Sequence, residues 1–335
     1  MEELRGKVVL LLAPEFFGYE LEIKKELENF EAEVIYFNER PNNNFFTKVF
    51  IRLNLKKLIQ KKIDSHYKKI IKSIQNKRID FLFLVSPETI DTKKIIKIKK
   101  LHKNIKIYTY IWDSVKNKKK ALDLLMESDK FFTFDSIDKE IDKKIKYLPL
   151  FYINDYKDIA KIQTEFLYDI SFIGTIHSDR YSTVKKIDSF ANKNNLRTYF
   201  YFYSPSRILF FFQKLFKKDF ISVNQDDVSF KSLDKDEVLE IIKKSKAVVD
   251  IHHPFQSGLT MRTMEMLGAK RKLLTTNKKI VEYDFYDENN ISIFERDNVN
   301  IDIEFFKNTF TNIDKNVYEK YSISEWLQKI FEGKR

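Results

Sequence analysis

Residues 247–276, AVVDIHHPFQSGLTMRTMEMLGAKRKLLTT, hold the pattern that decides the fold. The segment from Ala247 to Ile251 is almost entirely apolar, which predicts a buried strand of a parallel sheet. A polar loop at 252–258 leads into a helix predicted from Thr260 to Gly268, and a second short strand follows at 273–276. A strand, a loop, a helix and another strand in this order form one unit of an α/β sheet.

The start of this helix has the features of an anion site. Gly258 allows the backbone to turn tightly or approach a ligand, and Thr260 is a suitable N-cap. The exposed N–H groups and the helix dipole favour an anion there, and Arg262 adds a forked donor suited to a diphosphate. Glu265, one turn further on, is placed to accept from ribose hydroxyls. The alternative is an ordinary strand–loop–helix unit whose polar residues only cap it.

Composition limits the class of protein. The 335 residues are enough for two domains, and 43% hydrophobic with 33% charged residues indicate a globular chain. The absence of cysteine excludes disulfides, thiolate metal sites and cysteine nucleophiles. The charged start MEELRGK leads directly into a predicted strand, and no apolar run approaches twenty residues. We therefore expect neither a signal peptide nor a membrane span, and a cytoplasmic protein.

The net charge of +12 comes from abundant lysine. Much of it is expected on solvated helix faces. The sequence contains no nucleic-acid recognition module, so we do not expect nucleic acid as a partner. An anionic substrate or an anionic membrane surface fits the charge better. The basic region 48–77 has apolar residues three and four apart, which predicts either a helix covering a sheet or an amphipathic surface resting on lipid.

Strands and helices alternate along the whole chain, which predicts an α/β fold with parallel sheets. We expect a first domain at 1–150, a linker at 151–166 and a second domain at 167–335. Polar residues and one glycine follow several predicted strands, at the edge where open α/β sheets bind ligands. These residues are Glu15 and Asp113 in the first half, and Gly174, Thr175 and Arg180 in the second.

Several segments resemble the GT-B glycosyltransferases. Pro254 to Thr276 is similar to the nucleotide-sugar stretch of that superfamily, with Glu265 at the ribose-binding glutamate and Gly268 at the helix-ending glycine. DISFIGT (169–175) resembles the opening of the donor domain. WDS (112–114), FDSID (134–138) and YLPLFY (147–152) resemble segments of bacterial capsular and lipopolysaccharide glycosyltransferases. The resemblance implies two Rossmann-like domains facing across a cleft, with the donor in the second.

The resemblance also implies functional residues. A nucleotide-sugar donor would bind at Gly174, Thr175, Arg180, His253, Ser257, Gly258, Thr260, Arg262 and Glu265. Ser257 stands where many retaining enzymes have a second glutamate, which leaves the stereochemical outcome open. An inverting enzyme needs a general base on the acceptor side, for which Asp113 and Glu15 are the candidates. Asp113 could instead cap a helix, and Glu15 could lie in a solvated loop.

No DxD-type motif is evident that would hold a catalytic Mg²⁺ ion, and the neighbouring His252 and His253 are not a metal pattern. We therefore expect no metal and no cofactor beyond the nucleotide sugar. The function implied is a hexosyltransferase-like enzyme acting on a capsular or lipopolysaccharide acceptor that is a glycan or lipid-linked glycan, with the enzyme peripheral on the inner membrane face. The alternatives are a nucleotide-sugar 2-epimerase and a non-catalytic nucleotide- or glycan-binding scaffold.

Overall fold

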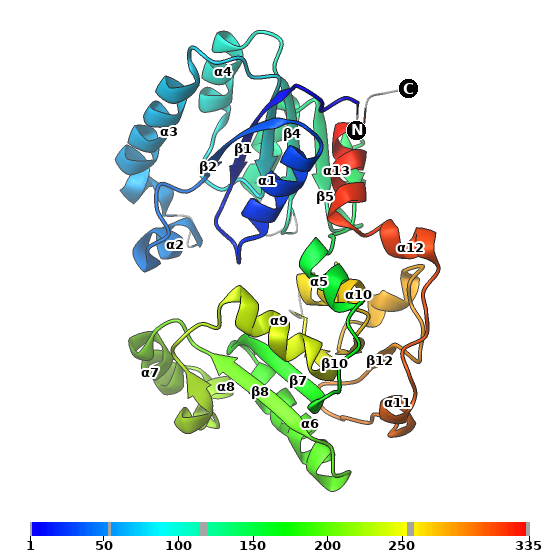
Figure 1. The fold of residues 1–335 in the computed structure, drawn as a ribbon. Coiled ribbons are helices and arrows are strands. Elements are labelled where there is room, and N and C mark those ends of the chain that lie inside the picture. Colours follow the sequence, from blue (N-terminus) through cyan, green and yellow to red (C-terminus); the bar gives the residue numbers. More distant parts are fainter. Residues whose placement is uncertain (1, 53–54, 114, 116–118, 253–257, 333–335) are drawn as a thin grey trace. The chain divides into compact units, whose positions relative to one another are not determined.

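The computed structural model describes residues 2–52, 55–113, 115, 119–252 and 258–332. The chain divides into two compact units. The first consists of residues Met1–Leu150 together with Ile323–Arg335, and the second of Phe151–Ser322. Each unit is built around a six-stranded sheet (Figure 1).

All strands of the first sheet are parallel, in the order β2-β1-β3-β4-β5-β6. The strands are β1 (Val8–Ala13), β2 (Glu33–Asn38), β3 (Phe81–Val85), β4 (Lys106–Ile111), β5 (Lys130–Thr133) and β6 (Ile145–Tyr147). The helices are α1 (Tyr19–Asn29), α2 (Phe45–Arg52), α3 (Gln60–Ile74), α4 (Thr92–Leu101) and α13 (Ile323–Phe331), with 3-10 turns η1 (Lys56–Ile59), η2 (Lys119–Glu127) and η3 (Asp138–Glu140).

Strand β3 shows why the central strands are apolar throughout. Leu82 and Leu84 belong to the core cluster formed with α3 and α4. The intervening Phe81 and Phe83 contact the rings of Phe331 and Trp326 in α13. Because successive side chains point to opposite faces and helices cover both, neither face of this strand can be polar.

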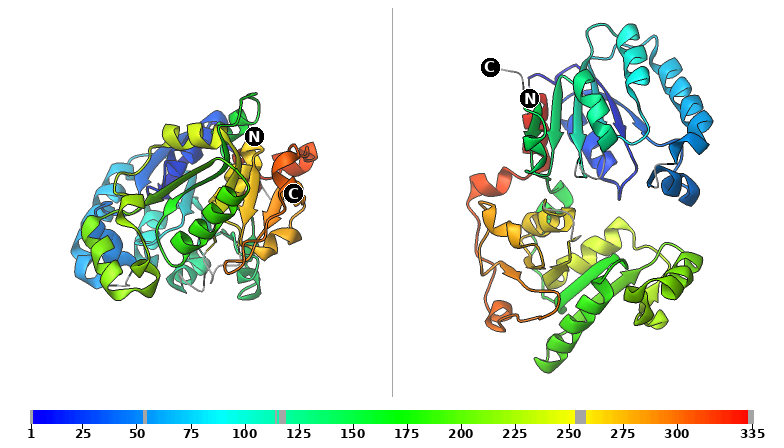
Figure 2. Two further views of the ribbon diagram at one scale, coloured as in Figure 1. Left: turned by 90° about the horizontal axis from the view of Figure 1, so that it is seen from below. Right: turned by 180° about the vertical axis from the view of Figure 1, so that it is seen from behind.

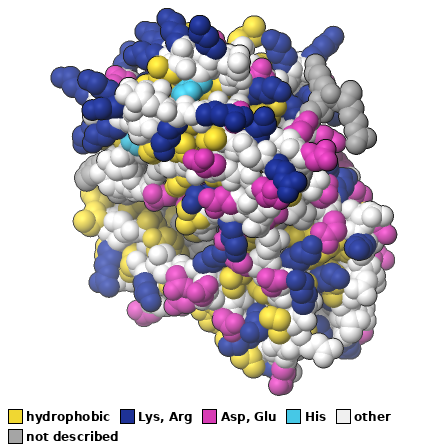
Figure 3. Space-filling view, turned by 45° about the horizontal axis from the view of Figure 1, so that its top comes forward, with side chains coloured by type: hydrophobic (Ala, Val, Ile, Leu, Met, Phe, Trp, Pro, Cys, Tyr) yellow, Lys and Arg dark blue, Asp and Glu magenta, His cyan; other side chains and the backbone are white. Residues whose placement is uncertain are grey.

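The basic region near residues 48–77 is broken once, between α2 and η1, and continues as α3. The apolar residues of α3, namely Ile63, Tyr67, Ile70 and Ile74, are buried in the core of the first unit. Lysines between them face outward, and Lys and Arg side chains are spread over the face shown in Figure 3, interspersed with acidic ones. The apolar side of α3 therefore covers the sheet, and it does not face lipid.

The second sheet is also parallel throughout, in the order β12-β11-β10-β7-β8-β9. Its strands are β7 (Tyr168–Thr175), β8 (Thr198–Tyr203), β9 (Val228–Ser229), β10 (Ser245–Asp250), β11 (Lys272–Thr275) and β12 (Ile291–Ile293). The helices are α5 (Asn154–Ile159), α6 (Arg180–Lys193), α7 (Arg207–Phe216), α8 (Lys218–Ile221), α9 (Lys235–Lys243), α10 (Met261–Ala269), α11 (Glu304–Lys307) and α12 (Lys315–Glu319), with η4 (Gln225–Asp227) and η5 (Lys278–Glu282). The views in Figure 2 show helices on both faces of each sheet.

The C-terminus differs from the expected assignment of 167–335 to one domain. Helix α13 packs against β3 and β4 of the first sheet through Trp326 and Phe331, and it also contacts α1. Lys130 at the start of β5 donates to the carbonyl of Ile330 at 2.7 Å, so the end of α13 is also tied to that sheet. The amphipathic pattern of α13 shows that it must cover something, but it does not say which sheet.

The segment 151–166, expected to be a linker, begins with structure of its own. Helix α5 contacts α9 and α10, and Asp155 in its first turn pairs with Lys235. Tyr152, just ahead of α5, is completely buried. This part of the segment belongs to the packed body of the second unit.

Candidate functional site

The carboxyl ends of β7 and β10 form the centre of the candidate site. The chain winds from β7 through β8 to β9 on one side, then returns to β10 and continues to β12 on the other. Ligands of open α/β sheets bind where the strand order reverses in this way. Gly174 and Thr175 end β7, Arg180 opens α6 directly after it, and α10 follows β10. The fold thus brings these predicted donor residues to one sheet edge.

Helix α10 is anchored by the last residue of β10. Thr260 is the N-cap, as predicted, and its hydroxyl oxygen accepts from the backbone N–H of Thr263 at 3.2 Å. The hydroxyls of Thr260 and Thr263 both donate to Oδ2 of Asp250, at 2.5 and 2.9 Å. Asp250 is buried at 4% exposure, and sequence analysis did not single it out. It fixes the start of the helix relative to the strand.

Arg262 and Glu265 face the same side of α10 and form an ion pair. Arg262 Nη1 lies 2.6 Å from Glu265 Oε2, and the two side chains are 19% and 9% exposed. Arg262 Nη2 also reaches the carbonyl of Ile173 in β7, at 3.5 Å. A diphosphate at Arg262 and a ribose at Glu265 would therefore compete with a contact that the two residues make with each other.

Two further arginines lie at this edge. Arg180 donates through Nε and Nη2 to the carbonyl of Ile251, at 3.0 and 2.8 Å. Arg296 donates to Asp179 Oδ1 at 2.6 Å and to the carbonyl of His252. Burial lowers the pKa of Arg180, and the nearby cations Arg296 and Arg262 lower it further. The carboxylates of Asp250 and Asp179 raise this pKa and so oppose the shift. Three arginines thus lie close together, beside the carboxylates of Asp179, Asp250 and Glu265.

Arg296 was missed by sequence analysis. Its signal is weak, because it lies three residues beyond a short strand, β12, and nothing in the local sequence links it to α10. Arg296 comes to the edge that carries α10 only because β12 pairs in parallel with β11, and β11 with β10.

The other predicted donor residues have different surroundings. The carbonyl of Gly258 accepts from Asn277 Nδ2 at 3.3 Å. A Cβ on Gly174 would lie 2.6 Å from the ring of Phe172, so packing within β7 is one reason for that glycine. His252 Nδ1 is 2.8 Å from the Thr276 hydroxyl. His253 and Ser257 lie outside the described residues.

The two candidate bases lie at the carboxyl edge of the first sheet but not together. Glu15 follows β1 and is exposed, with its carboxylate bound by the side-chain amides of Asn38, at 3.0 Å, and Asn43. Asp113 follows β4 and is half-buried. Because β3 separates β1 from β4, the strands that carry them are about 10 Å apart. Glu15 and Asp113 therefore cannot act together as a pair of carboxylates, and only one of them could be the base.

Asp113 belongs to an acidic group. Burial raises the pKa of Asp138, and the negative charges of Asp135 and Asp113 add to that shift. Asp138 Oδ2 accepts from the Val115 backbone N–H at 2.9 Å and from the Thr133 hydroxyl at 2.7 Å. These two hydrogen bonds lower the pKa of Asp138 and so oppose the shift. Asp113 is thus close enough to Asp138 for its charge to act on that carboxyl group.

A polar network beside β2 was also missed. Arg40 Nε and Glu88 Oε2 pair at 2.6 Å with side chains only 13% and 10% exposed. The fully buried Glu39 accepts from the Tyr67 hydroxyl at 3.2 Å and from the backbone N–H of Ile90 at 2.8 Å. These bonds tie the end of β2 to the segment after β3, which supports the edge that carries Glu15.

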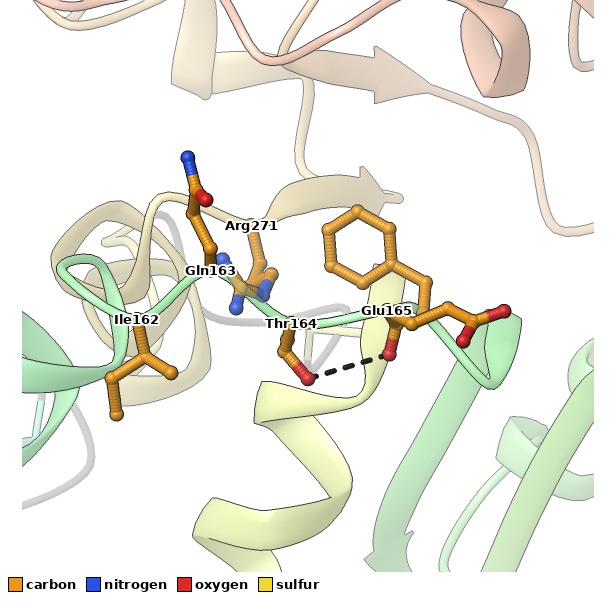
Figure 4. Close-up of a pocket in the computed structure, with 6 residues that line it drawn as sticks. Ile162, Gln163, Thr164, Glu165 and Arg271 are labelled. Atoms are coloured by element: carbon orange, nitrogen blue, oxygen red, sulfur yellow. Dashed lines mark hydrogen bonds between the residues drawn. The ribbon is translucent and has the colours of Figure 1, made fainter.

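Metal ligands and cavities add little to this site. Across the residues that the structure describes, no group of three or more His, Asp or Glu side chains is placed to hold a metal ion. An open hollow of about 520 Å³ is lined by residues 162–166 and Arg271 (Figure 4). Its lining residues directly precede β7 and β11, so the hollow lies at the amino-terminal edge of the second sheet. The start of α10 lies at the opposite, carboxyl edge. Arg271 there donates to the carbonyls of Lys243 and Ala269 at the ends of α9 and α10, which is a structural role.

Comparison with known proteins places the fold. No protein-family model matches the chain, and none of the curated proteins matches its sequence significantly. Among solved structures, HepE from Anabaena in complex with UDP and glucose has a TM-score of 0.57 at 11% identity, covering 97% of this chain and 98% of that one. The chain has the GT-B fold.

Two further structures agree with this fold. A glycosyltransferase from Rickettsia africae has a TM-score of 0.51 at 14% identity, over 98% of this chain and 100% of its own. Sucrose-phosphate synthase from Thermosynechococcus elongatus has a TM-score of 0.52 at 8% identity, over 97% and 95%. At these identities the likeness shows the fold alone. The predicted pair of Rossmann-like domains is confirmed.

Proposed function

We propose that the protein is a glycosyltransferase that binds a nucleoside diphosphate sugar at the carboxyl edge of its second sheet. The observation that carries this proposal is the gathering of Arg180, Arg262 and the anchored start of α10 at the strand-order reversal. Backbone N–H groups, a helix dipole and arginine donors together suit a diphosphate. HepE structures with UDP and with UDP-glucose, and the fold shared with a glycosyltransferase, support the choice of ligand.

In this proposal the diphosphate displaces Glu265 from Arg262, and Glu265 turns to the ribose hydroxyls. Arg262, Arg180 and the start of α10 then stabilise the negative charge that develops on the leaving diphosphate, which needs no metal ion. The acceptor is a cell-envelope glycan, capsular or lipopolysaccharide, free or lipid-linked. Asp113 or Glu15 removes the proton of its hydroxyl, which gives an inverting transfer.

The first test is calorimetric titration of UDP, GDP, ADP and their sugars, with and without EDTA. Arg262→Ala should weaken binding of the preferred nucleotide about 10- to 100-fold, because a charge-assisted hydrogen bond contributes about 1.5–3 kcal/mol. Glu265→Ala should weaken the nucleotide but not inorganic pyrophosphate. Arg197→Ala is the matched control, since Arg197 pairs with Asp169 at the other edge of the same sheet. Equal loss in the control, or no nucleotide bound by the wild type, would contradict the proposal.

Acceptor-side roles are separable from donor binding. Asp113→Ala or Glu15→Ala, whichever residue is the base, should abolish sugar transfer and leave the nucleotide affinity unchanged. A nucleotide-sugar 2-epimerase would instead release an altered nucleotide sugar with no acceptor present. A non-catalytic scaffold would bind the nucleotide without transfer or donor hydrolysis. Product analysis by mass spectrometry, with and without acceptor glycans, distinguishes these three functions.

A further inference from the structure

Helix α7 of the second unit turns its apolar side outward. Five of its residues recur at the spacing of one helix face and are exposed at 48–79%: Ile208, Phe211, Phe212, Leu215 and Phe216. The rings of Phe212 and Phe216 stack with centroids 6.4 Å apart, and Ile221 in α8 is 66% exposed. We call these six residues the α7–α8 surface. Soluble proteins seldom leave so many large apolar side chains together in water, so this surface indicates a partner.

The helix itself is firmly formed, so the exposure is not a consequence of local disorder. Ser206 caps it by accepting from the backbone N–H of Leu209 at 3.3 Å. Phe210, on the inner side, is fully buried and contacts the rings of Phe220 and Phe230. One aromatic residue thus fixes α7 to the core of the second unit while the opposite face stays outside. In α3 the arrangement is reversed, with the apolar face buried and lysines outside.

Cations flank the α7–α8 surface. Residues 205–221 contain Arg207, Lys214, Lys217 and Lys218 against a single carboxylate, Asp219, a net charge of +3. Lys217 and Lys218 are exposed beside Phe216 in sequence. The partner must therefore be apolar at its centre and anionic at its rim. A second copy of the chain would bring two +3 patches face to face, which charge repulsion opposes.

We propose that the α7–α8 surface docks on a membrane containing anionic phospholipid, with α7 lying in the plane of the headgroups. Phenylalanine and leucine side chains would enter the boundary with the acyl chains, and the lysines would contact the headgroups, as amphipathic interfacial helices do. The docking is peripheral, and within the described part of the chain no helix is long and apolar enough to cross a bilayer. This inference is independent of the nucleotide site, because none of its residues contributes to that site.

Vesicle flotation tests the proposal without any assay of activity. The wild-type protein should float with phosphatidylcholine vesicles containing about 30% phosphatidylglycerol, and bind pure phosphatidylcholine about tenfold less or worse. Leu215→Ser with Phe216→Ser should reduce binding about tenfold or more, because it removes the two most exposed side chains of the α7–α8 surface. Lys217→Glu with Lys218→Glu should reduce it similarly and weaken its dependence on salt.

A control variant distinguishes binding through the α7–α8 surface from non-specific hydrophobic binding to vesicles. Leu58 and Met126 of the first unit are 70% and 73% exposed, so Leu58→Ser with Met126→Ser removes a matched apolar area elsewhere and should leave flotation unchanged. Each variant should keep the wild-type melting temperature and nucleotide affinity. Failure of the wild type to float, or loss of flotation in the first-unit control instead, would overturn the proposal. So would a dimer in analytical ultracentrifugation that Leu215→Ser with Phe216→Ser dissociates, because that would assign the surface to a second copy.

Discussion

Replacing Gly268 by alanine should destabilise the second unit, although alanine is the better helix former. Gly268 lies inside the last turn of α10, and a Cβ there would sit 2.7 Å from Cγ and 2.8 Å from Cβ of Tyr152. Tyr152 is fully buried and cannot swing away, because its hydroxyl donates to the carbonyl of Tyr318 at 3.0 Å. The hydroxyl of Tyr318 in turn donates to the carbonyl of Gly268 at 2.6 Å. The added methyl group therefore has no free space.

Whether Gly268→Ala stabilises or destabilises the protein depends on the cost of overpacking and the gain in helix propensity. Overpacking a rigid core site costs about 1–3 kcal/mol, whereas alanine gains about 1 kcal/mol over glycine in helix propensity. Because the contacts with Tyr152 would be only 2.7–2.9 Å, the cost lies in the upper part of that range, about 2–3 kcal/mol, and the net loss should be about 1–2 kcal/mol. In a unit of this size that corresponds to a fall in melting temperature of about 2–8 °C. Gly268→Val should lower it further, since the β-branched side chain is larger and also disfavours the helix.

The melting temperature can be followed by circular dichroism or differential scanning fluorimetry, and Lys270→Gly is the paired control. Lys270 ends α10 with φ of 49°, a left-handed conformation that glycine adopts at no cost. Glycine removes a backbone strain of about 1 kcal/mol, whereas the lost cation–π contact between Lys270 and Tyr318 costs about 0.5 kcal/mol. Lys270→Gly should therefore be slightly more stable than the wild type. A more stable Gly268→Ala would refute the packing argument and restore the interpretation of Gly268 as a helix-ending glycine.

Two further predictions concern buried charges. Burial lowers the pKa of Lys272 from 10.5 to about 8, so between these values the unfolded chain binds a proton that the folded chain has released. The free energy of unfolding should therefore rise with pH over this window, by up to about 3 kcal/mol relative to that of Lys272→Met. Urea titrations of both proteins at each pH measure it, and a difference between them that does not change with pH would contradict the shift. Asp250→Ala removes the acceptor of two hydroxyl bonds and should cost about 2–4 kcal/mol, whereas Asp250→Asn keeps an acceptor oxygen and should cost less than half as much. Similar losses in the two variants would show that the two threonine hydroxyls do not depend on this oxygen.

The central strands and α10 could be predicted because their signals are local. Parallel strands covered on both faces are apolar at every position, and Thr260 has the chemistry of an N-cap directly before a helical pattern. Both sheets and the start of α10 were found in this way and are confirmed. The end of α10 was placed one residue early, because glycine is the usual helix stop and nothing local shows that Gly268 is needed for packing against Tyr152.

The features that sequence analysis missed depend on contacts distant along the chain. The assignment of α13 to the first unit follows from aromatic contacts of Trp326 and Phe331 with strands more than 200 residues earlier. Arg296 reaches the candidate site only through the order of strands β10, β11 and β12. Asp250 looks like the polar end of any strand until its oxygen is seen to hold two threonine hydroxyls. Local sequence contains no information about such pairings.

The charge placed at the helix starts of the second sheet supports a ligand there. Helix N-termini favour carboxylates, and α9 follows that rule with Asp236 and Glu237 in its first turn. Helices α6, α7 and α10 break it, since each has an arginine and no acidic residue in its first turn. Cations against the positive end of a dipole cost stability, and here Asp179, Asp250 and Glu265 oppose that cost from neighbouring positions. Departures from local rules that gather at one point of a fold are typical of functional sites. The departures of α6 and α10 lie at the reversal of strand order, where the diphosphate of the proposed donor would bind to their arginines.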